Sequence, residues 1–274
     1  MSRSNKACSC RLRWKVSAGK QVVWYIPSHH EQQRPLPQSP GTGSALGLIA
    51  LYFLLQIVLS VIVGLGASLI TKQPRQAIMT LNVVIALPSA ASAVLFFIYR
   101  LWPQLWSLST PPGLGLCQSK APGFYLVGIV FGLGFPVLGG LLTRWLSHGH
   151  LVLQNVTELG RHAGPILRIV LALVVSSIGP LVEEVLFRGV LLSALLRCLP
   201  VHLAVLGGTL LFNAVHLPGL YFQWYALPAL MLLALALCWL RLTSGSLWPA
   251  VLAHSLNNTM VILPWLLNTS GLHS

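Results

Sequence analysis

Long apolar stretches constrain the fold of this chain more than any other feature of its sequence. A helix needs about 20 apolar residues to cross the roughly 30 Å of hydrocarbon in a bilayer. Hydrophobic residues make up 55% of the 274 residues and charged residues only 8%, whereas soluble domains contain roughly 25% charged residues. We therefore expect an all-α, polytopic transmembrane helical bundle. Its predicted spans lie at about 45–70, 77–99, 124–142, 165–199, 203–217, 224–242 and 246–267.

The stretch 165–199 is too long for one simple crossing, because a straight helix over these residues would extend about 52 Å. Gly179 and Pro180 interrupt it, and Pro180 lacks a backbone N–H and clashes with the preceding turn. We expect a kink there, which gives seven or eight spans in all. Gly128 and Gly132 are spaced as in membrane helices that pack closely together.

The first 44 residues are polar and contain seven of the seventeen Lys and Arg residues in a chain of net charge +13. Pro35, Pro37 and Pro40 lie just before the first apolar stretch. We therefore expect residues 1–44 to form a flexible basic tail. Such a tail contacts anionic lipid headgroups and stays on the cytoplasmic side, and we do not expect nucleic acid as a partner. The predicted location is a bacterial plasma membrane with a cytoplasmic N-terminus. An organelle membrane is the alternative, since the tail is rich in Arg and Ser.

Two adjacent glutamates, Glu183 and Glu184, lie inside the apolar stretch 165–199, although the chain has only four acidic residues and no aspartate. A charge at the bilayer centre costs about 2.5–3.5 kcal/mol, so such a group faces protein or water and has a partner. Arg188 follows Glu184 by one helical turn, where the two can form an ion pair. Glu183 lies about 100° around the helix and needs a partner from another helix. A buried ion pair that locks two helices is the alternative interpretation of the three charges.

Two later apolar stretches contain polar residues one helical turn apart. Phe212 precedes His216 by four positions, and His254 precedes Asn258 by four. A histidine on an apolar helix is more often a packed core residue than a catalyst. Together with a carboxylate, however, two imidazoles and an amide supply the groups that activate a water and bind an oxyanion.

The segments EEVLFRG, FNAVH and HSLNN resemble the E-E-x-x-x-R, F-x-x-x-H and H-x-x-x-N motifs of the CPBP intramembrane proteases. That family includes the type II CAAX prenyl endopeptidases and the bacterial Abi proteins. The resemblance covers about 165–260, with the three motifs in order. The apolar stretches predict N-terminal transmembrane helices and polar loops over 45–160, and the resemblance implies that 161–274 forms the catalytic transmembrane core.

The resemblance implies an intramembrane endopeptidase that acts on membrane-associated or lipidated, CAAX-like proteins or peptides. Glu183 would be the general base that polarises a water, and His216 would hold that water and carry the proton. His254 and Asn258 would donate hydrogen bonds to the oxyanion of the tetrahedral intermediate.

Three further residues would support this site. Glu184 would pair with Arg188 and orient His216 or its helix, and Phe212 would pack beside the site. The resemblance implies a water and no metal in the site, so we assign no cofactor and no metal ligand. Zinc remains open, because two histidines and one or two glutamates can supply a ligand set.

Two other functions compete with proteolysis. A member of the same family without activity would be a membrane scaffold or a bacteriocin-immunity protein. A proton-coupled transporter would use Glu183 and Glu184 as a relay, although the sequence has no internal repeat of the kind that builds many transporters. A diaspartyl protease is excluded because the chain has no aspartate, and no H-E-x-x-H segment of the common zinc proteases occurs.

Overall fold

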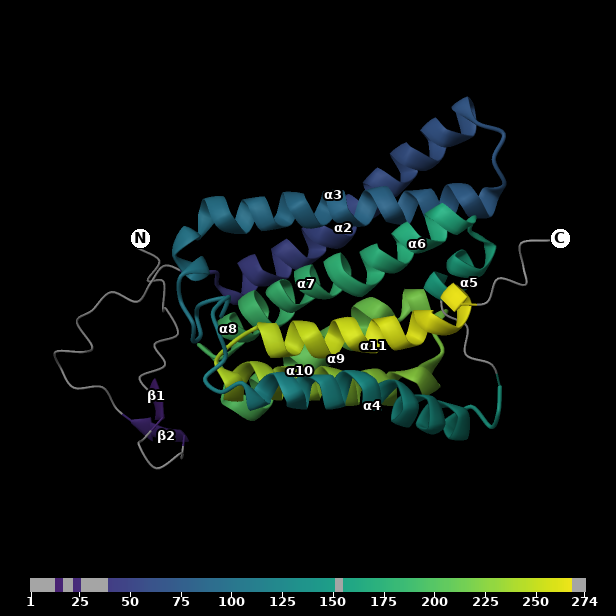
Figure 1. The fold of residues 1–274 in the computed structure, drawn as a ribbon. Coiled ribbons are helices and arrows are strands. Elements are labelled where there is room, and N and C mark those ends of the chain that lie inside the picture. Colours follow the sequence, from purple (N-terminus) through teal and green to yellow (C-terminus); the bar gives the residue numbers. More distant parts are fainter. Residues whose placement is uncertain (1–12, 17–21, 26–38, 151–154, 268–274) are drawn as a thin grey trace.

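A computed structural model of the chain describes residues 13–16, 22–25, 39–150 and 155–267. Between 39 and 267 the described residues form helices joined by loops, arranged as an elongated bundle (Figure 1). The all-α bundle predicted from the sequence is therefore confirmed. Ahead of it, β1 (Arg13–Val16) and β2 (Val22–Tyr25) form a short antiparallel hairpin. The predicted flexible tail otherwise falls mostly outside the described residues, and helix α2 already begins at Thr42.

The first half of the bundle consists of α2 (Thr42–Ile70), α3 (Arg75–Leu101), the short 3-10 helix η1 (Pro103–Trp106), α4 (Gly123–Leu146) and α5 (Asn155–His162). One unbroken helical column follows, made of α6 (Pro165–Leu173), η2 (Val174–Ile178), α7 (Gly179–Glu184), η3 (Val185–Leu191) and α8 (Leu192–Leu195). The remaining elements are α9 (Val201–His216), η4 (Pro218–Leu220), η5 (Trp224–Ala226), α10 (Leu227–Ser244) and α11 (Trp248–Leu267).

In the part of the chain that the structure describes, six helical segments are long and apolar enough to cross a membrane, which makes the chain a multi-pass integral membrane protein. They are Thr42–Ile70, Arg75–Leu101, Gly123–Leu146, Pro165–Leu195, Trp224–Ser244 and Trp248–Leu267. The fifth predicted span, 203–217, forms α9, which is apolar but shorter, at 16 residues. An eighth span is not present in the described part of the chain, because Pro165–Leu195 stays one column.

The helical column accommodates Pro180 by widening. In η2, a π-helical segment, the N–H of Gly179 donates to the carbonyl of Val174, five residues back instead of four. Immediately after Glu184 the column widens again in the π-helical segment η3. The sequence predicted an interruption at Pro180 but not this form of it. π-Helical turns are rare and occur often at functional sites.

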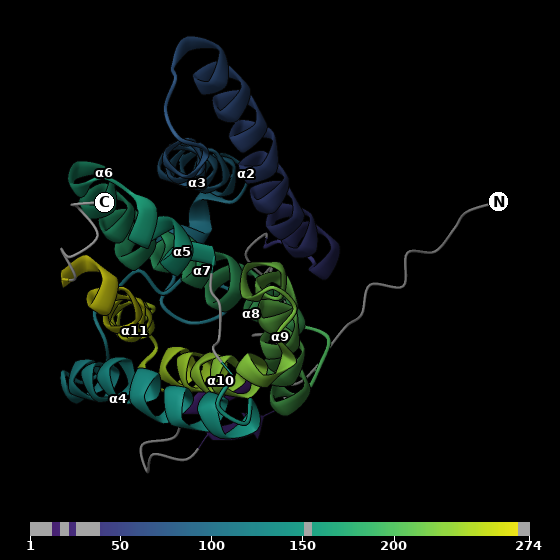
Figure 2. The same cartoon turned by 90° about the vertical axis from the view of Figure 1, so that its right-hand side faces the viewer.

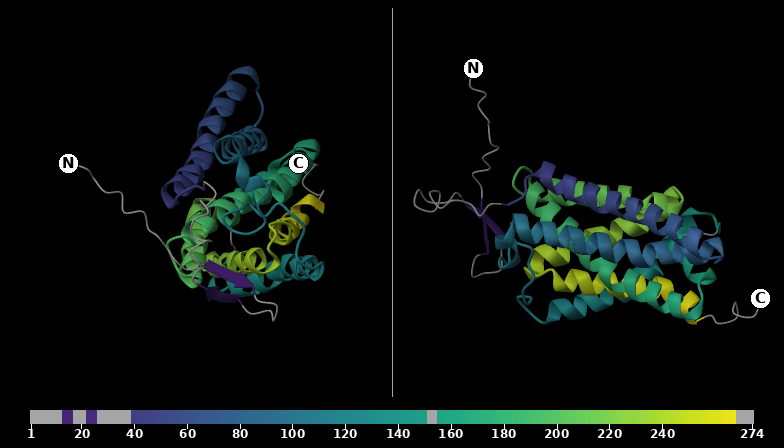
Figure 3. Two further views of the ribbon diagram at one scale, coloured as in Figure 1. Left: turned by 90° about the vertical axis from the view of Figure 1, so that its left-hand side faces the viewer. Right: turned by 90° about the horizontal axis from the view of Figure 1, so that it is seen from above.

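Viewed end-on, the column α6–α8 runs between the α2–α3 pair and the group formed by α4, α10 and α11 (Figures 2 and 3). Helix α4 packs against α11 through small residues, as the sequence predicted. A Cβ atom on Gly132 would come within 2.6 Å of the Ala253 carbonyl oxygen, and one on Gly128 within 2.8 Å of the Pro249 carbonyl oxygen. This close contact fixes the position of α11 along its axis relative to α4. It thereby also fixes the position of His254, which follows Ala253.

Candidate functional site

Three elements that are far apart in the sequence bring the predicted polar residues together. Glu183 lies at the end of α7, His216 at the end of α9 and His254 in the first half of α11. The Glu183 Oε2 atom lies 3.6 Å from Nε2 of His216 and 3.8 Å from Nε2 of His254. Glu183 thus finds its expected partners on other helices, and there are two of them.

Glu184 and Arg188 form the ion pair that their spacing predicts. Arg188 Nη1 donates to Glu184 Oε1 over 2.8 Å, and the two side chains are 1% and 0% exposed. The same carboxylate oxygen lies 2.8 Å from Nδ1 of His254, and Arg188 Nη2 donates to the carbonyl of Ala234 on α10 over 3.3 Å. Glu184 therefore joins η3 to α11.

The expected link from Glu184 to His216 is not present, because Glu184 contacts His254 instead. Nδ1 of His216 lies 2.7 Å from the carbonyl oxygen of Phe212, one turn earlier on the same helix. Neighbouring residues on a helix point in directions about 100° apart, so Glu183 and Glu184 face different surroundings. Glu183 reaches both histidines, and Glu184 reaches only the one on α11.

The partners of the two imidazoles fix where their protons lie. A backbone carbonyl and an ionised carboxylate only accept hydrogen bonds, so Nδ1 of His216 and Nδ1 of His254 both carry hydrogen. Each ring therefore presents Nε2 to Glu183, as an acceptor when the ring is neutral and as a donor when it is protonated. The three side chains converge with atoms that can each exchange a proton.

Phe212 has a larger role than packing beside the site. Its ring is fully buried, and its centroid lies 4.4 Å from that of His216 and 5.8 Å from that of His254. The guanidinium carbon of Arg188 lies 4.3 Å from the same centroid, in a cation–π contact. One aromatic ring thus restricts both imidazoles and the cation that pairs with Glu184.

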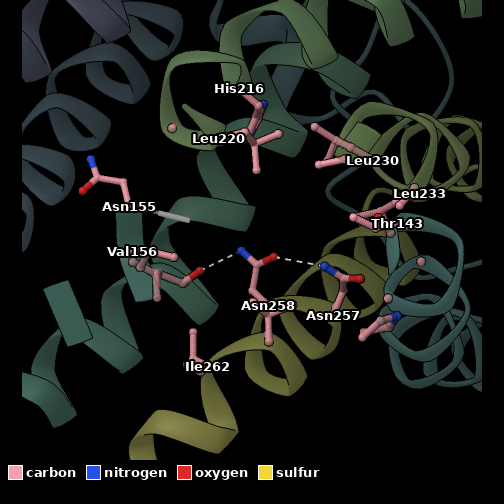
Figure 4. A pocket seen from close by; sticks show the side chains of 18 of the residues that line it. Thr143, Asn155, Val156, His216, Leu220, Leu230, Leu233, Asn257, Asn258 and Ile262 are labelled. Atoms are coloured by element: carbon pink, nitrogen blue, oxygen red, sulfur yellow. Dashed lines mark hydrogen bonds between the residues drawn. The ribbon is translucent and has the colours of Figure 1, made fainter. Parts of the chain in front are cut away.

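Asn258 lies one turn beyond His254 on α11, as predicted, and its amide is held at both ends (Figure 4). Its Nδ2 atom donates to the carbonyl of Val175 in η2 over 2.9 Å. Its Oδ1 atom accepts from Nδ2 of Asn257 over 3.3 Å. Sequence reasoning missed Asn257, although the adjacent asparagines in an apolar helix could have indicated it.

A cavity of about 810 Å³ opens beside these residues, and Glu183, His216, His254 and Asn258 all line it. Glu184, Arg188 and Phe212 do not line it, so they support the site from behind. Most of the remaining wall is apolar and comes from α3, α4, α5, α10 and α11 (Figure 4). The sequence did not indicate that the helices before residue 165 would contribute to this wall. The cavity gives Glu183 a path to small molecules from outside the core.

The described residues contain no group of three or more His, Cys, Asp or Glu side chains placed to hold a metal ion. The histidines and glutamates of the site are instead arranged as pairs of proton donors and acceptors. The contacts that position them are those of Glu183 with both histidines and of Glu184 with Arg188 and His254.

Residues 165–260 match the family model described as type II CAAX prenyl endopeptidase Rce1-like. The matched segment runs from the start of α6 into α11 and contains all seven residues that the sequence singled out. The resemblance seen in the three motifs is therefore confirmed over this segment. Searches among curated proteins and among solved structures gave no match.

Proposed function

We propose that the chain hydrolyses peptide bonds of membrane-associated or lipidated proteins, a function that the match of residues 165–260 to the Rce1-like family of type II CAAX prenyl endopeptidases supports. The observation that supports this function best is the convergence of one carboxylate and two imidazoles on a cavity within membrane-spanning helices. Ionisable groups in such helices are costly and are retained chiefly where they act.

Glu183 is the proposed general base. Its distances of 3.6 and 3.8 Å to the two Nε2 atoms are longer than a direct hydrogen bond and suit a water that contacts all three groups. As the water oxygen bonds to the substrate carbonyl carbon, its proton passes to Glu183. Glu183 passes that proton to Nε2 of His216, and His216 delivers it to the amide nitrogen as the C–N bond breaks, so both groups return to their starting states.

His254 is the proposed donor to the oxyanion. Its Nδ1–H is bound by Glu184, so a protonated ring directs Nε2–H to the cavity while the buried carboxylate balances its charge. Arg188 holds that carboxylate in place. The two glutamates would then have different tasks, with Glu183 exchanging protons and Glu184 staying ionised. The N–H of Asn258 that is not bound to Val175 supplies a second donor.

The cavity wall supports a hydrophobic substrate segment. Side chains such as Val83, Leu230 and Ile262 line it, and its polar groups form one set around Glu183 and the asparagines of α11 and a second set on α4, α5 and the loop between them. Apolar pockets with a few placed polar groups are typical of sites that bind hydrophobic ligands in a fixed orientation. A peptide beside a lipid anchor has this character.

The test is cleavage of a library of membrane-anchored peptides by the purified protein in lipid vesicles. Glu183→Gln should abolish cleavage, whereas Glu158→Gln, which changes a partly exposed acid that does not line the cavity, should leave it intact. Full activity in Glu183→Gln would refute the proposed base. A parallel reaction with a zinc chelator distinguishes the mechanisms: loss of cleavage that zinc restores would mean that Glu183 and the histidines hold a metal.

A further inference from the structure

The hydrogen bond between Asn258 and Val175 joins the cavity wall on α11 to the widened turn in the helical column. A backbone carbonyl accepts but does not donate, so the amide nitrogen of Asn258 must face Val175 and its oxygen must face Asn257. The amide cannot rotate by 180° without losing both bonds. Its second N–H therefore has a fixed direction.

The carbonyl of Val175 is available because of Pro180. In η2 the backbone bonds span five residues, as from Gly179 to Val174. The next donor in this register would be the N–H of residue 180, and its acceptor would be the carbonyl of Val175. Proline has no N–H, so that acceptor has no partner within the helix.

The three carbonyls before Val175 differ from it in the origin of their hydrogen-bond donors. Those of residues 172–174 are satisfied within the helix, by the hydroxyls of Ser176 and Ser177 and by the N–H of Gly179. The carbonyl of Val175, by contrast, accepts from a side chain on another helix, α11. A carbonyl freed in a membrane-spanning helix needs a donor from protein or from water, and here the Asn258 amide supplies it at the cavity wall.

We infer that Pro180 is a positioning residue, which leaves the Val175 carbonyl free to orient the Asn258 amide toward the reacting carbonyl of the substrate. The inference rests on the proposed peptide hydrolysis. It assigns a role in the reaction to a buried proline that does not line the cavity. Proline at this position removes one helical hydrogen bond and thereby leaves the Val175 carbonyl for the Asn258 amide.

Pro180→Ala separates this role from a structural one, because it restores the missing N–H. The new N–H competes with Asn258 for Val175. We expect kcat to fall about five- to tenfold with KM within about twofold, since the amide acts on the transition state. The midpoint of thermal unfolding should equal or exceed that of the parent, because alanine is much better than proline inside a helix. Pro88→Ala, inside α3 and outside the cavity wall, is the matched control and should leave kcat unchanged.

A double-mutant cycle with Asn258→Ala completes the test. If Pro180 acts through Asn258, the double variant should be no slower than Asn258→Ala alone. Unchanged kcat in Pro180→Ala, a lower unfolding midpoint, or additive losses in the double variant would each overturn the inference. Glu183→Gln in the same assay distinguishes failure of the proposed function from failure of this inference. If Glu183→Gln is active, the proposed function is refuted. If Glu183→Gln is inactive and Pro180→Ala is fully active, only the role of Pro180 is refuted.

Discussion

Replacing Arg188 by methionine should destabilise the protein because it removes the cation from a buried ion pair while keeping most of the side-chain volume. Glu184 and Arg188 are 0% and 1% exposed, and their atoms are 2.8 Å apart. The variant leaves a carboxylate that water does not reach, with only His254 to compensate its charge. Breaking a buried pair in this way costs about 3–5 kcal/mol. We expect the free energy of unfolding to fall by that amount.

Unfolding in mixed micelles, followed by tryptophan fluorescence as SDS is added, measures the change. Arg161→Met is the matched control, since Arg161 and Glu158 are 3.8 Å apart with side chains 62% and 36% exposed, and such surface pairs contribute about 0–1 kcal/mol. The double variant Glu184→Gln with Arg188→Met should recover more than half of the loss, because no charge is then left unpaired. Equal, small effects of Arg188→Met and Arg161→Met would refute the description of Glu184 as a buried charge.

Three further substitutions test the packing and the charge behind the site. Gly132→Ala should cost about 1–3 kcal/mol of stability, because its methyl group would meet the Ala253 carbonyl at 2.6 Å, whereas Gly134→Ala, with open space around it, should be neutral in the same SDS titration. Phe212→Leu should lower the free energy of unfolding by about 1–2 kcal/mol through loss of the cation–π contact, measured in the same way. Glu184→Gln should lower kcat about tenfold with little change in KM, since a neutral amide stabilises a protonated imidazole less than a carboxylate does. Steady-state kinetics check it, and an unchanged kcat would contradict the charge-balancing role.

The clustering of the site residues could be predicted because charges are rare in apolar helices. Glu183, Glu184 and Arg188 had to have partners, and helical spacing alone paired two of them. The resemblance implied that Glu184 orients His216 or its helix, whereas in the structure its carboxylate contacts His254 on α11. Spacing shows which residues share a face, but the neighbour of that face depends on how α9 and α11 pack around the column.

That a cavity reaches Glu183 could be predicted, since a base that activates water needs access to it, but the sequence predicted a polar cavity and its mostly apolar wall could not be foreseen. Its walls are mostly apolar side chains such as Val83 and Leu230, and in a membrane protein such residues look the same in sequence whether they face lipid, core or substrate. The form of the break at Pro180 was also out of reach. Proline removes a donor, but whether the helix kinks or widens depends on what satisfies the freed carbonyl, and Asn258 comes from a helix about 80 residues later.

The central claim is that Glu183 activates the water that cleaves a peptide bond, and one rate comparison tests it most directly. The parent protein, Glu183→Gln and Glu158→Gln are reconstituted in vesicles at equal amounts with a single membrane-anchored peptide that the parent cleaves. We predict that Glu183→Gln slows cleavage by about 100-fold or more, with unfolding unchanged, and that Glu158→Gln matches the parent. Cleavage by Glu183→Gln at the parental rate would contradict the account.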